Sequence, residues 1–161
     1  MKRLLNLKMT AMLLLGVLGS VNFTTLQADN PVEECSKELI RAFFPEPFVR
    51  ETLKKFNVPQ DKWDAIVKSL NEKEKDIVKI VEDKASKMNP NPLKDPSKRQ
   101  ETVKIFRETL LQVFSDALKA NGVSDDKQIQ TMLDDIQQQK VKHFADCLDK
   151  QTKQENTGET K

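Results

Sequence analysis

Hydrophobic residues recur every three or four positions along most of the chain after residue 30, the spacing that places them on one face of an α-helix. Cys35, Leu39 and Phe43 repeat at intervals of four, and a clearer stripe lies between residues 103 and 118. No stretch of six residues alternates apolar and polar side chains as a half-buried β-strand does. The pattern therefore predicts an all-α protein, a compact bundle of five or six helices.

Prolines mark the first helix boundaries. Pro45 and Pro47 cannot lie inside a helix, but Pro47 suits the first turn of the helix that follows, where its missing N–H costs nothing. The segment 60–88 allows two interpretations because its apolar stripe lapses in the middle. It forms either one long helix with an exposed centre or two short helices, and Asn71 with Glu74 resembles a capping pair.

The later boundaries carry capping residues as well. Asp95 followed by Pro96 is predicted to start the next helix, and Gly122 is predicted to end it in the left-handed conformation. Ser124 is then expected to cap the last helix, which extends to about residue 150. Residues 151–161 contain no apolar side chain and are predicted to be a disordered polar tail.

The first 28 residues differ in composition from the rest. Three basic residues precede an apolar run at 9–21, no Asp or Glu occurs before residue 29, and the small residue Ala28 closes the segment. This is typical of a secretory signal peptide, cleaved after Ala28. A membrane anchor is the alternative, but the run is far shorter than the roughly 20 residues that span a bilayer. We therefore expect export to a bacterial periplasm or beyond the cell, no membrane span after removal of residues 1–28, and one helical domain over residues 29–150.

Removing this segment changes the charge balance. The chain has 27 Lys and Arg against 25 Asp and Glu, and three of the basic residues lie in the first 28 positions. The exported chain would carry 24 basic and 25 acidic residues, so its net charge is close to zero. A balanced surface rich in Lys and poor in Arg gives no electrostatic reason to expect nucleic acid as a partner.

The chain has two cysteines, Cys35 and Cys147, one near each end of the predicted bundle. In an exported protein an even pair is most simply one disulfide. Such a bridge would restrict the unfolded chain by about 4–5 kcal/mol in the loop-entropy description. Two alternatives remain: a pair of buried free thiols, or a zinc site in which His143, four residues before Cys147, joins both cysteines.

The sequence contains no catalytic or cofactor-binding signature. It has no nucleophile elbow, phosphate loop or zinc-protease motif, and only two glycines follow residue 28. Paired carboxylates such as Asp125 with Asp126 are typical of helix starts in a highly charged chain. We therefore expect a non-enzymatic protein with no cofactor and no metal.

Five of the eight aromatic residues after position 28 fall within 21 positions around the two prolines: Phe43, Phe44, Phe48, Phe56 and Trp63. They form either a packed helix corner or an aromatic groove for a partner. Because two helix ends diverge at the prolines, we expect Phe44 and Phe48 to be the exposed, partner-binding or ligand-binding pair. The predicted function is protein–protein contact of a chaperone or adaptor kind, and the alternative is a carrier of an apolar ligand or lipid between helices.

Overall fold

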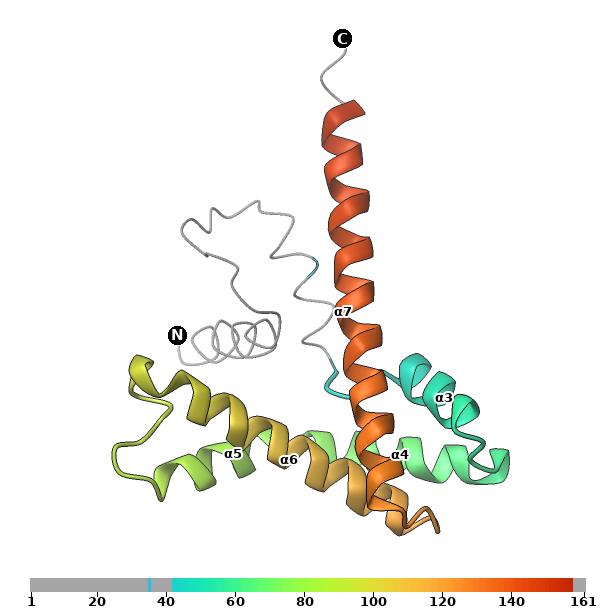
Figure 1. Cartoon of the computed structure of the whole chain (residues 1–161), viewed down its shortest axis with the longest axis horizontal. Helices are drawn as coiled ribbons and strands as arrows, with labels where there is room; N and C mark the ends of the chain where they lie inside the picture. The colour runs from blue at the N-terminus through green and yellow to red at the C-terminus, as the bar shows by residue number, and fades with distance from the viewer. Residues whose placement is uncertain (1–34, 36–41, 158–161) are drawn as a thin grey trace. The chain divides into compact units, whose positions relative to one another are not determined.

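The computed structural model describes Cys35 and residues 42–157, with side chains described as far as residue 150. The described residues form five α-helices and two short 3₁₀ helices and no strand (Figure 1). In chain order these are α3 Glu46–Lys55, η2 Gln60–Lys62, α4 Trp63–Glu74, α5 Ile77–Ser86, η3 Pro96–Lys98, α6 Arg99–Lys119 and α7 Asp126–Thr157. The predicted all-α class and number of helices are confirmed.

The chain divides into two compact units. The central unit is Phe43–Gln137, and the terminal unit contains Cys35, Ala42 and the described residues from Gln138 onward. Helix α7 is continuous through the boundary and belongs to both. Periodicity shows that a helix has an apolar face but not which element covers that face, so it does not reveal this division.

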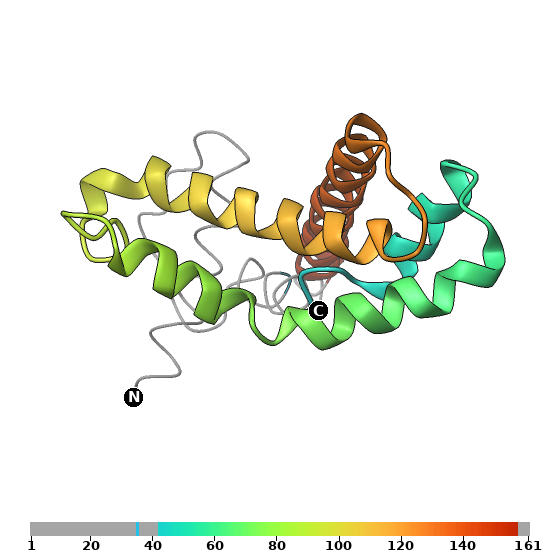
Figure 2. The same ribbon diagram turned by 90° about the horizontal axis from the view of Figure 1, so that it is seen from below.

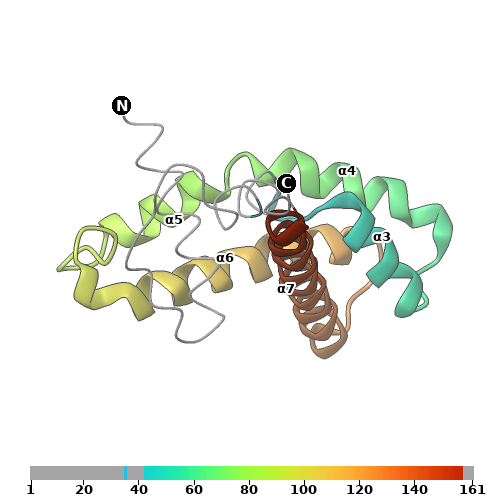
Figure 3. The same ribbon diagram turned by 90° about the horizontal axis from the view of Figure 1, so that it is seen from above.

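Helix α6 supplies the largest apolar face of the central unit. It lies alongside both α4 and α5, as Figure 2 shows from below, and Figure 3 shows α3 beside α4. Its buried residues recur at helical spacing: Thr102, Ile105, Phe106, Thr109, Leu110, Val113, Phe114, Ala117 and Leu118. Each large apolar side chain buried in this way contributes about 1.5–3 kcal/mol relative to an exposed one. Burial of this stripe is therefore a large stabilising contribution to the unit.

Residues 60–88 form two helices, which settles the ambiguity in the sequence. The α-helical hydrogen bonding is interrupted at Lys75 and Asp76, although the backbone of both stays in the right-handed helical region. Asn71 lies inside α4, and the carboxylate of Glu74 accepts a hydrogen bond from the backbone N–H of Phe43. The predicted Asn71–Glu74 capping pair is therefore wrong, because a long-range acceptor role for Glu74 replaces the local one.

Helix α3 ends in a Schellman motif that the sequence analysis missed. Asn57 has a φ of 55°, the backbone N–H of Val58 donates to the carbonyl of Leu53 at 2.9 Å, and that of Asn57 donates to Lys54 at 3.1 Å. Asn tolerates this left-handed conformation better than most residues. Val58 and Leu53 are both buried, and apolar residues at these two positions are typical of the motif.

Helix α6 ends in the same way at the predicted glycine. Gly122 has a φ of 84°, and the backbone N–H of Val123 donates to the carbonyl of Leu118 at 3.0 Å. A Cβ at position 122 would come within 2.9 Å of Lys62 Nζ, the end of a flexible side chain. Backbone conformation is thus the stronger reason for glycine here, and the prediction for Gly122 is confirmed.

The two predicted N-caps have different outcomes. Asp95 caps η3, which leads directly into α6, because its Oδ1 accepts from the backbone N–H of Ser97 at 2.9 Å. Ser124 does not cap α7. Its neighbour Asp125 does, accepting from the backbone N–H of Gln128 at 2.9 Å. The prediction for Ser124 is wrong by one residue, because Ser and Asp are both good caps and sequence alone does not rank adjacent candidates.

Polar contacts hold the start of α7 to the rest of the central unit. Asp135 accepts a hydrogen bond from the hydroxyl of Thr52 at 2.8 Å and forms an ion pair with Lys55. Asp134 pairs with Arg107 of α6 at 3.2 Å. Thr52 is buried, so its hydroxyl needs this acceptor, and the carboxylate of Asp135 satisfies it.

In the terminal unit the two cysteines are bonded to each other. The Cys35 and Cys147 sulfurs lie 2.07 Å apart and the Cα atoms 5.8 Å apart, within the normal range for a disulfide. The predicted bridge is confirmed. Its two alternatives, free thiols and a zinc site with His143, are wrong because both sulfurs are committed to the bond. Among the described residues no group of three His, Cys, Asp or Glu side chains could hold a metal ion.

Some predictions fall at the ends of the chain. Helix α7 continues to Thr157, where residues 151–157 were expected to be disordered. Adding residues such as Gln, Lys and Glu to an existing helix gains one hydrogen bond per residue ordered, which favours continuation. The remaining tail residues 158–161, the signal segment 1–28 and most of the first predicted helix, residues 36–41, lie outside the described residues.

Candidate functional site

The structure places the predicted exposed pair in two different environments. Phe44 is 1% exposed, and its ring stacks on that of Phe114 with centroids 5.7 Å apart and planes 23° apart. Phe48, in the first turn of α3, is half-buried. The expected exposure of Phe44 is therefore wrong, because α6 covers the ring that the diverging helix ends leave open. Partner binding through Phe48 stays a prediction.

The rest of the aromatic cluster also packs at the corner. Phe43 is buried and its ring lies 5.3 Å from that of Phe106. Trp63 is half-buried and its indole N–H donates to the carbonyl of Val58 at 2.9 Å. These contacts match the packed-corner interpretation more closely than an aromatic groove.

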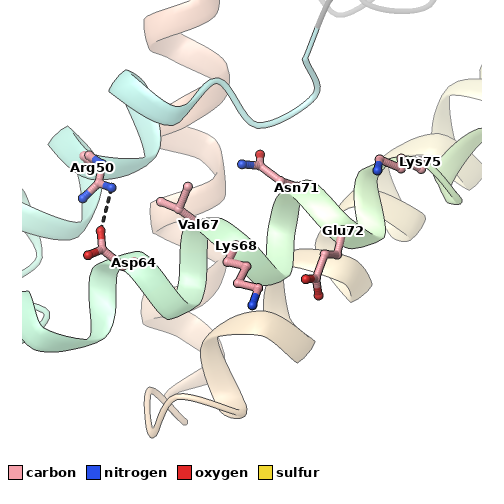
Figure 4. A pocket seen from close by; sticks show the side chains of 7 residues that line it. All are labelled: Arg50, Asp64, Val67, Lys68, Asn71, Glu72 and Lys75. Carbon is pink, nitrogen blue, oxygen red and sulfur yellow. Dashed lines mark hydrogen bonds and ion pairs between the residues drawn. The ribbon is translucent and has the colours of Figure 1, made fainter.

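A cleft of about 340 Å³ opens where α3 and α4 lie side by side in the central unit, and Figure 4 shows its lining. The lining is charged except for one amide and one apolar side chain: Arg50, Asp64, Val67, Lys68, Asn71, Glu72 and Lys75. Six of these seven residues lie on or just after α4, and Arg50 reaches in from α3. We call these seven residues the α3–α4 cleft.

One end of the cleft is closed by an ion-pair network. Arg50 donates from Nη2 to Asp64 Oδ1 at 2.7 Å and from Nε to Glu46 Oε1 at 2.8 Å. These hydrogen bonds, first to Asp64 and then to Glu46, raise the pKa of the Arg50 guanidinium above its ordinary value. Arg50 is therefore charged at every accessible pH, and its charge is already paired with two carboxylates.

The rest of the lining has polar groups that form no hydrogen bond or ion pair within the described part of the chain. Four exposed side chains make no hydrogen bond or ion pair with another described residue: Lys68, Asn71, Glu72 and Lys75. Lys68 and Glu72 extend from the same side of α4, one turn apart (Figure 4). At the same spacing on α6, Lys104 and Glu108 do form an ion pair, at 3.9 Å. The cleft thus offers cations, an anion and an amide for intermolecular contact.

The lining offers charged and amide groups for contact with a polar surface, and it contains no Ser, Thr, Cys or His. Its one apolar residue, Val67, is too little surface to bury an apolar ligand. The sequence analysis missed the cleft because alternating charges at helical spacing occur on several helices, and only the position of α3 beside α4 distinguishes this face.

Comparison with known proteins adds no family to this description. No protein-family model matches the chain, and no characterised protein or solved structure is similar enough to count as a match. Within the described residues, no helix is long and apolar enough to cross a membrane.

Proposed function

We propose that the chain is an exported, non-enzymatic helical protein that acts as an adaptor, binding a partner protein at the α3–α4 cleft. The observation that carries this proposal is the set of charged and amide groups along α4 that have no partner among the described residues. Export is supported by the composition of residues 1–28 and by the disulfide, which persists in oxidising compartments.

The chemistry of the cleft favours a polar partner surface. Lys68 and Lys75 present cations on either side of the carboxylate of Glu72, and Asn71 can both donate and accept. Exposed ion pairs contribute only about 0–1 kcal/mol each, so these contacts would set orientation and specificity more than affinity. The partner would then be held weakly and released readily, as adaptors require.

An adaptor is better supported than the other two functions that the sequence suggested. A chaperone that captures unfolded clients needs exposed aromatic surface, and the burial of Phe44 removes the centre of the expected groove. A carrier needs an enclosed apolar pocket. The α3–α4 cleft is open and has one apolar residue in its lining, so it does not support a carrier.

The test is a pull-down from the native compartment with a charge-swap variant. Lys68→Glu with Glu72→Lys reverses the pattern in the cleft while preserving net charge, helical spacing and side-chain size. Lys104→Glu with Glu108→Lys makes the same change on α6, outside the cleft, and is the matched control. We expect mass spectrometry to find a protein partner that copurifies with the wild type and with the α6 variant. The amount of this partner should be at least tenfold lower with the α4 variant.

Stability must be measured on the same samples. Both swaps change exposed residues, so both should leave the free energy of unfolding within about 0.5 kcal/mol of wild type. A partner retained by the α4 variant would show that binding occurs elsewhere on the chain. Copurification of a lipid in place of a protein would instead support the carrier.

A further inference from the structure

Helix α4 carries an alternating order of charges on the face that lines the α3–α4 cleft (Figure 4). In chain order the charged residues are Asp64, Lys68, Glu72 and Lys75, so the signs are negative, positive, negative and positive. Their spacing of three or four residues places them within about 100° of the helix circumference. All four are exposed, and the backbone at Lys75 keeps the helical conformation just after the last residue of α4. The face therefore presents one continuous row of charges.

This order of charges is self-complementary, because its signs are reversed when it is read from the other end. A second copy of α4 that runs antiparallel to the first brings each charge opposite one of the other sign. Asp64 then faces Lys75 of the second copy, and Lys75 faces Asp64 of the second copy. Lys68 and Glu72 face each other across the pair in the same way, and all these contacts are centred on the turn of α4 around Leu70. One two-fold axis therefore relates them, which is the symmetry of most homodimers.

The groups in this row are available for such contacts. Asp64 accepts from Arg50 through Oδ1 at 2.7 Å, and its side chain is still 87% exposed, so its second oxygen can accept from another cation. The other three charged residues of the row make no hydrogen bond or ion pair with another described residue. Asn71 lies beside the expected two-fold axis, where an amide can both donate to its symmetry mate and accept from it.

We infer that the protein bound at the α3–α4 cleft is a second copy of this chain, paired antiparallel along α4 about a two-fold axis. This inference rests on the proposed function, because it names the protein that the cleft binds. It is supported by the complementarity of the charged face with itself. The contacts are exposed charges, and Val67 is the one apolar residue of the lining, so the dimer should be weak and should dissociate as the salt concentration rises.

Sedimentation velocity at low ionic strength, on the chain as it is purified from its native compartment, tests this inference. We expect the wild type to form a dimer as its concentration rises. Lys68→Glu or Glu72→Lys alone should raise the dissociation constant by about tenfold or more, because each places like charges opposite each other at two symmetry-related positions. Lys104→Glu and Glu108→Lys make the same changes of charge on α6 and are the matched controls. They should leave the dissociation constant within about twofold of wild type.

Mixing the two α4 single variants should restore the dimer. In the mixed pair every charge of the row again faces one of the opposite sign, so we expect a dissociation constant within about threefold of wild type. Misfolding of either variant cannot produce such a restoration.

The double variant Lys68→Glu with Glu72→Lys separates a second copy from any other partner. Its own row of charges stays self-complementary, so it should dimerise within about threefold of wild type. It should not pair with the wild-type chain, because like charges then meet at positions 68 and 72. The loss of the native chain from a pull-down with this variant follows for the same reason.

Three outcomes would overturn the inference. They are a wild type that stays monomeric, single variants that dimerise as the wild type does, and a mixture of the two single variants that stays monomeric. If the wild type is monomeric while the pull-down captures a different protein through the cleft, the second copy is refuted and the proposed function stands. A pull-down that captures no protein sensitive to the α4 swap would refute the proposed function and this inference together.

Discussion

Phe44→Ala tests the packing of the central unit at its aromatic corner. The ring is almost fully buried and stacks on Phe114, so its removal exposes no solvent-facing surface and leaves a cavity. An aromatic side chain buries about 150–250 Å², which at about 25 cal/mol per Å² corresponds to roughly 4–6 kcal/mol. Phe to Ala changes in cores typically cost about 3–5 kcal/mol, and we expect Phe44→Ala to fall in this range.

The matched variant is Phe48→Ala, four residues later at the same corner. Phe48 is partly exposed, so less buried surface is lost than at Phe44, and we expect a smaller cost of roughly 2–3 kcal/mol. Urea unfolding can be followed by the fluorescence of Trp63, the only tryptophan, which lies in the central unit. A double-mutant cycle of Phe44 with Phe114 should show a coupling of about 0.5–1.5 kcal/mol for the stacked pair.

The result that would refute this reasoning is a Phe44→Ala variant within about 0.5 kcal/mol of wild type, the range of surface substitutions. Phe44 would then be accessible, and the aromatic groove expected from the sequence would regain its central residue. If Phe48→Ala also leaves stability unchanged but abolishes suppression of client aggregation, a chaperone would replace the adaptor.

Three further predictions concern the ends of the helices and of the chain. Asp125→Ala should cost about 1 kcal/mol in urea unfolding and Ser124→Ala less than about 0.5, whereas the reverse order would restore the serine as the cap. Hydrogen bonds from the hydroxyl and backbone N–H of Ser97 lower the pKa of Asp95 below its ordinary 3.8. The stabilisation by the Asp95 carboxylate should therefore be complete above about pH 4 and be lost as the pH falls further. The difference in urea midpoint between wild type and Asp95→Ala should be smaller at pH 3 than at pH 7. An equal difference at both pH values would show that the charge of the carboxylate does not contribute to stability. N-terminal sequencing of exported protein should begin at or near Asp29, and recovery of Met1 in a membrane fraction would instead show an anchor.

The helices themselves could be predicted because several local signals agree on each one. The apolar stripe of α6 has helical spacing, Asp95 and Pro96 mark its approach, and Gly122 marks its end. Each signal reflects the conformation of a few neighbouring residues, which is information that a sequence carries directly. The disulfide was predictable for a different reason, since two cysteines in a chain that is expected to be exported leave few alternatives.

The burial of Phe44 could not be predicted in this way. Phe44 adjoins the apolar stripe of the first predicted helix, but Pro45 ends that helix directly after it, and the partner that covers its ring, Phe114, lies 70 positions away. The contact between Thr52 and Asp135 is equally remote in sequence, with 83 positions between them. Polar pairs of this kind have no periodic signature in the sequence. A carboxylate that will accept a hydrogen bond from a buried hydroxyl cannot be distinguished there from one that faces solvent.

The α3–α4 cleft shows the same principle at the candidate site. Lys68 with Glu72 on α4 and Lys104 with Glu108 on α6 are chemically identical pairs at identical spacing. One pair borders a cleft and makes no contact with other described residues, while the other is joined across one turn of an exposed face. The two pairs have different surroundings, because α3 lies against α4 and brings Arg50 to one end of the α3–α4 cleft. The exchanged residue types and the net charge are therefore equal in the two swaps, so a difference in partner binding between them would report the different positions of the two pairs in the fold.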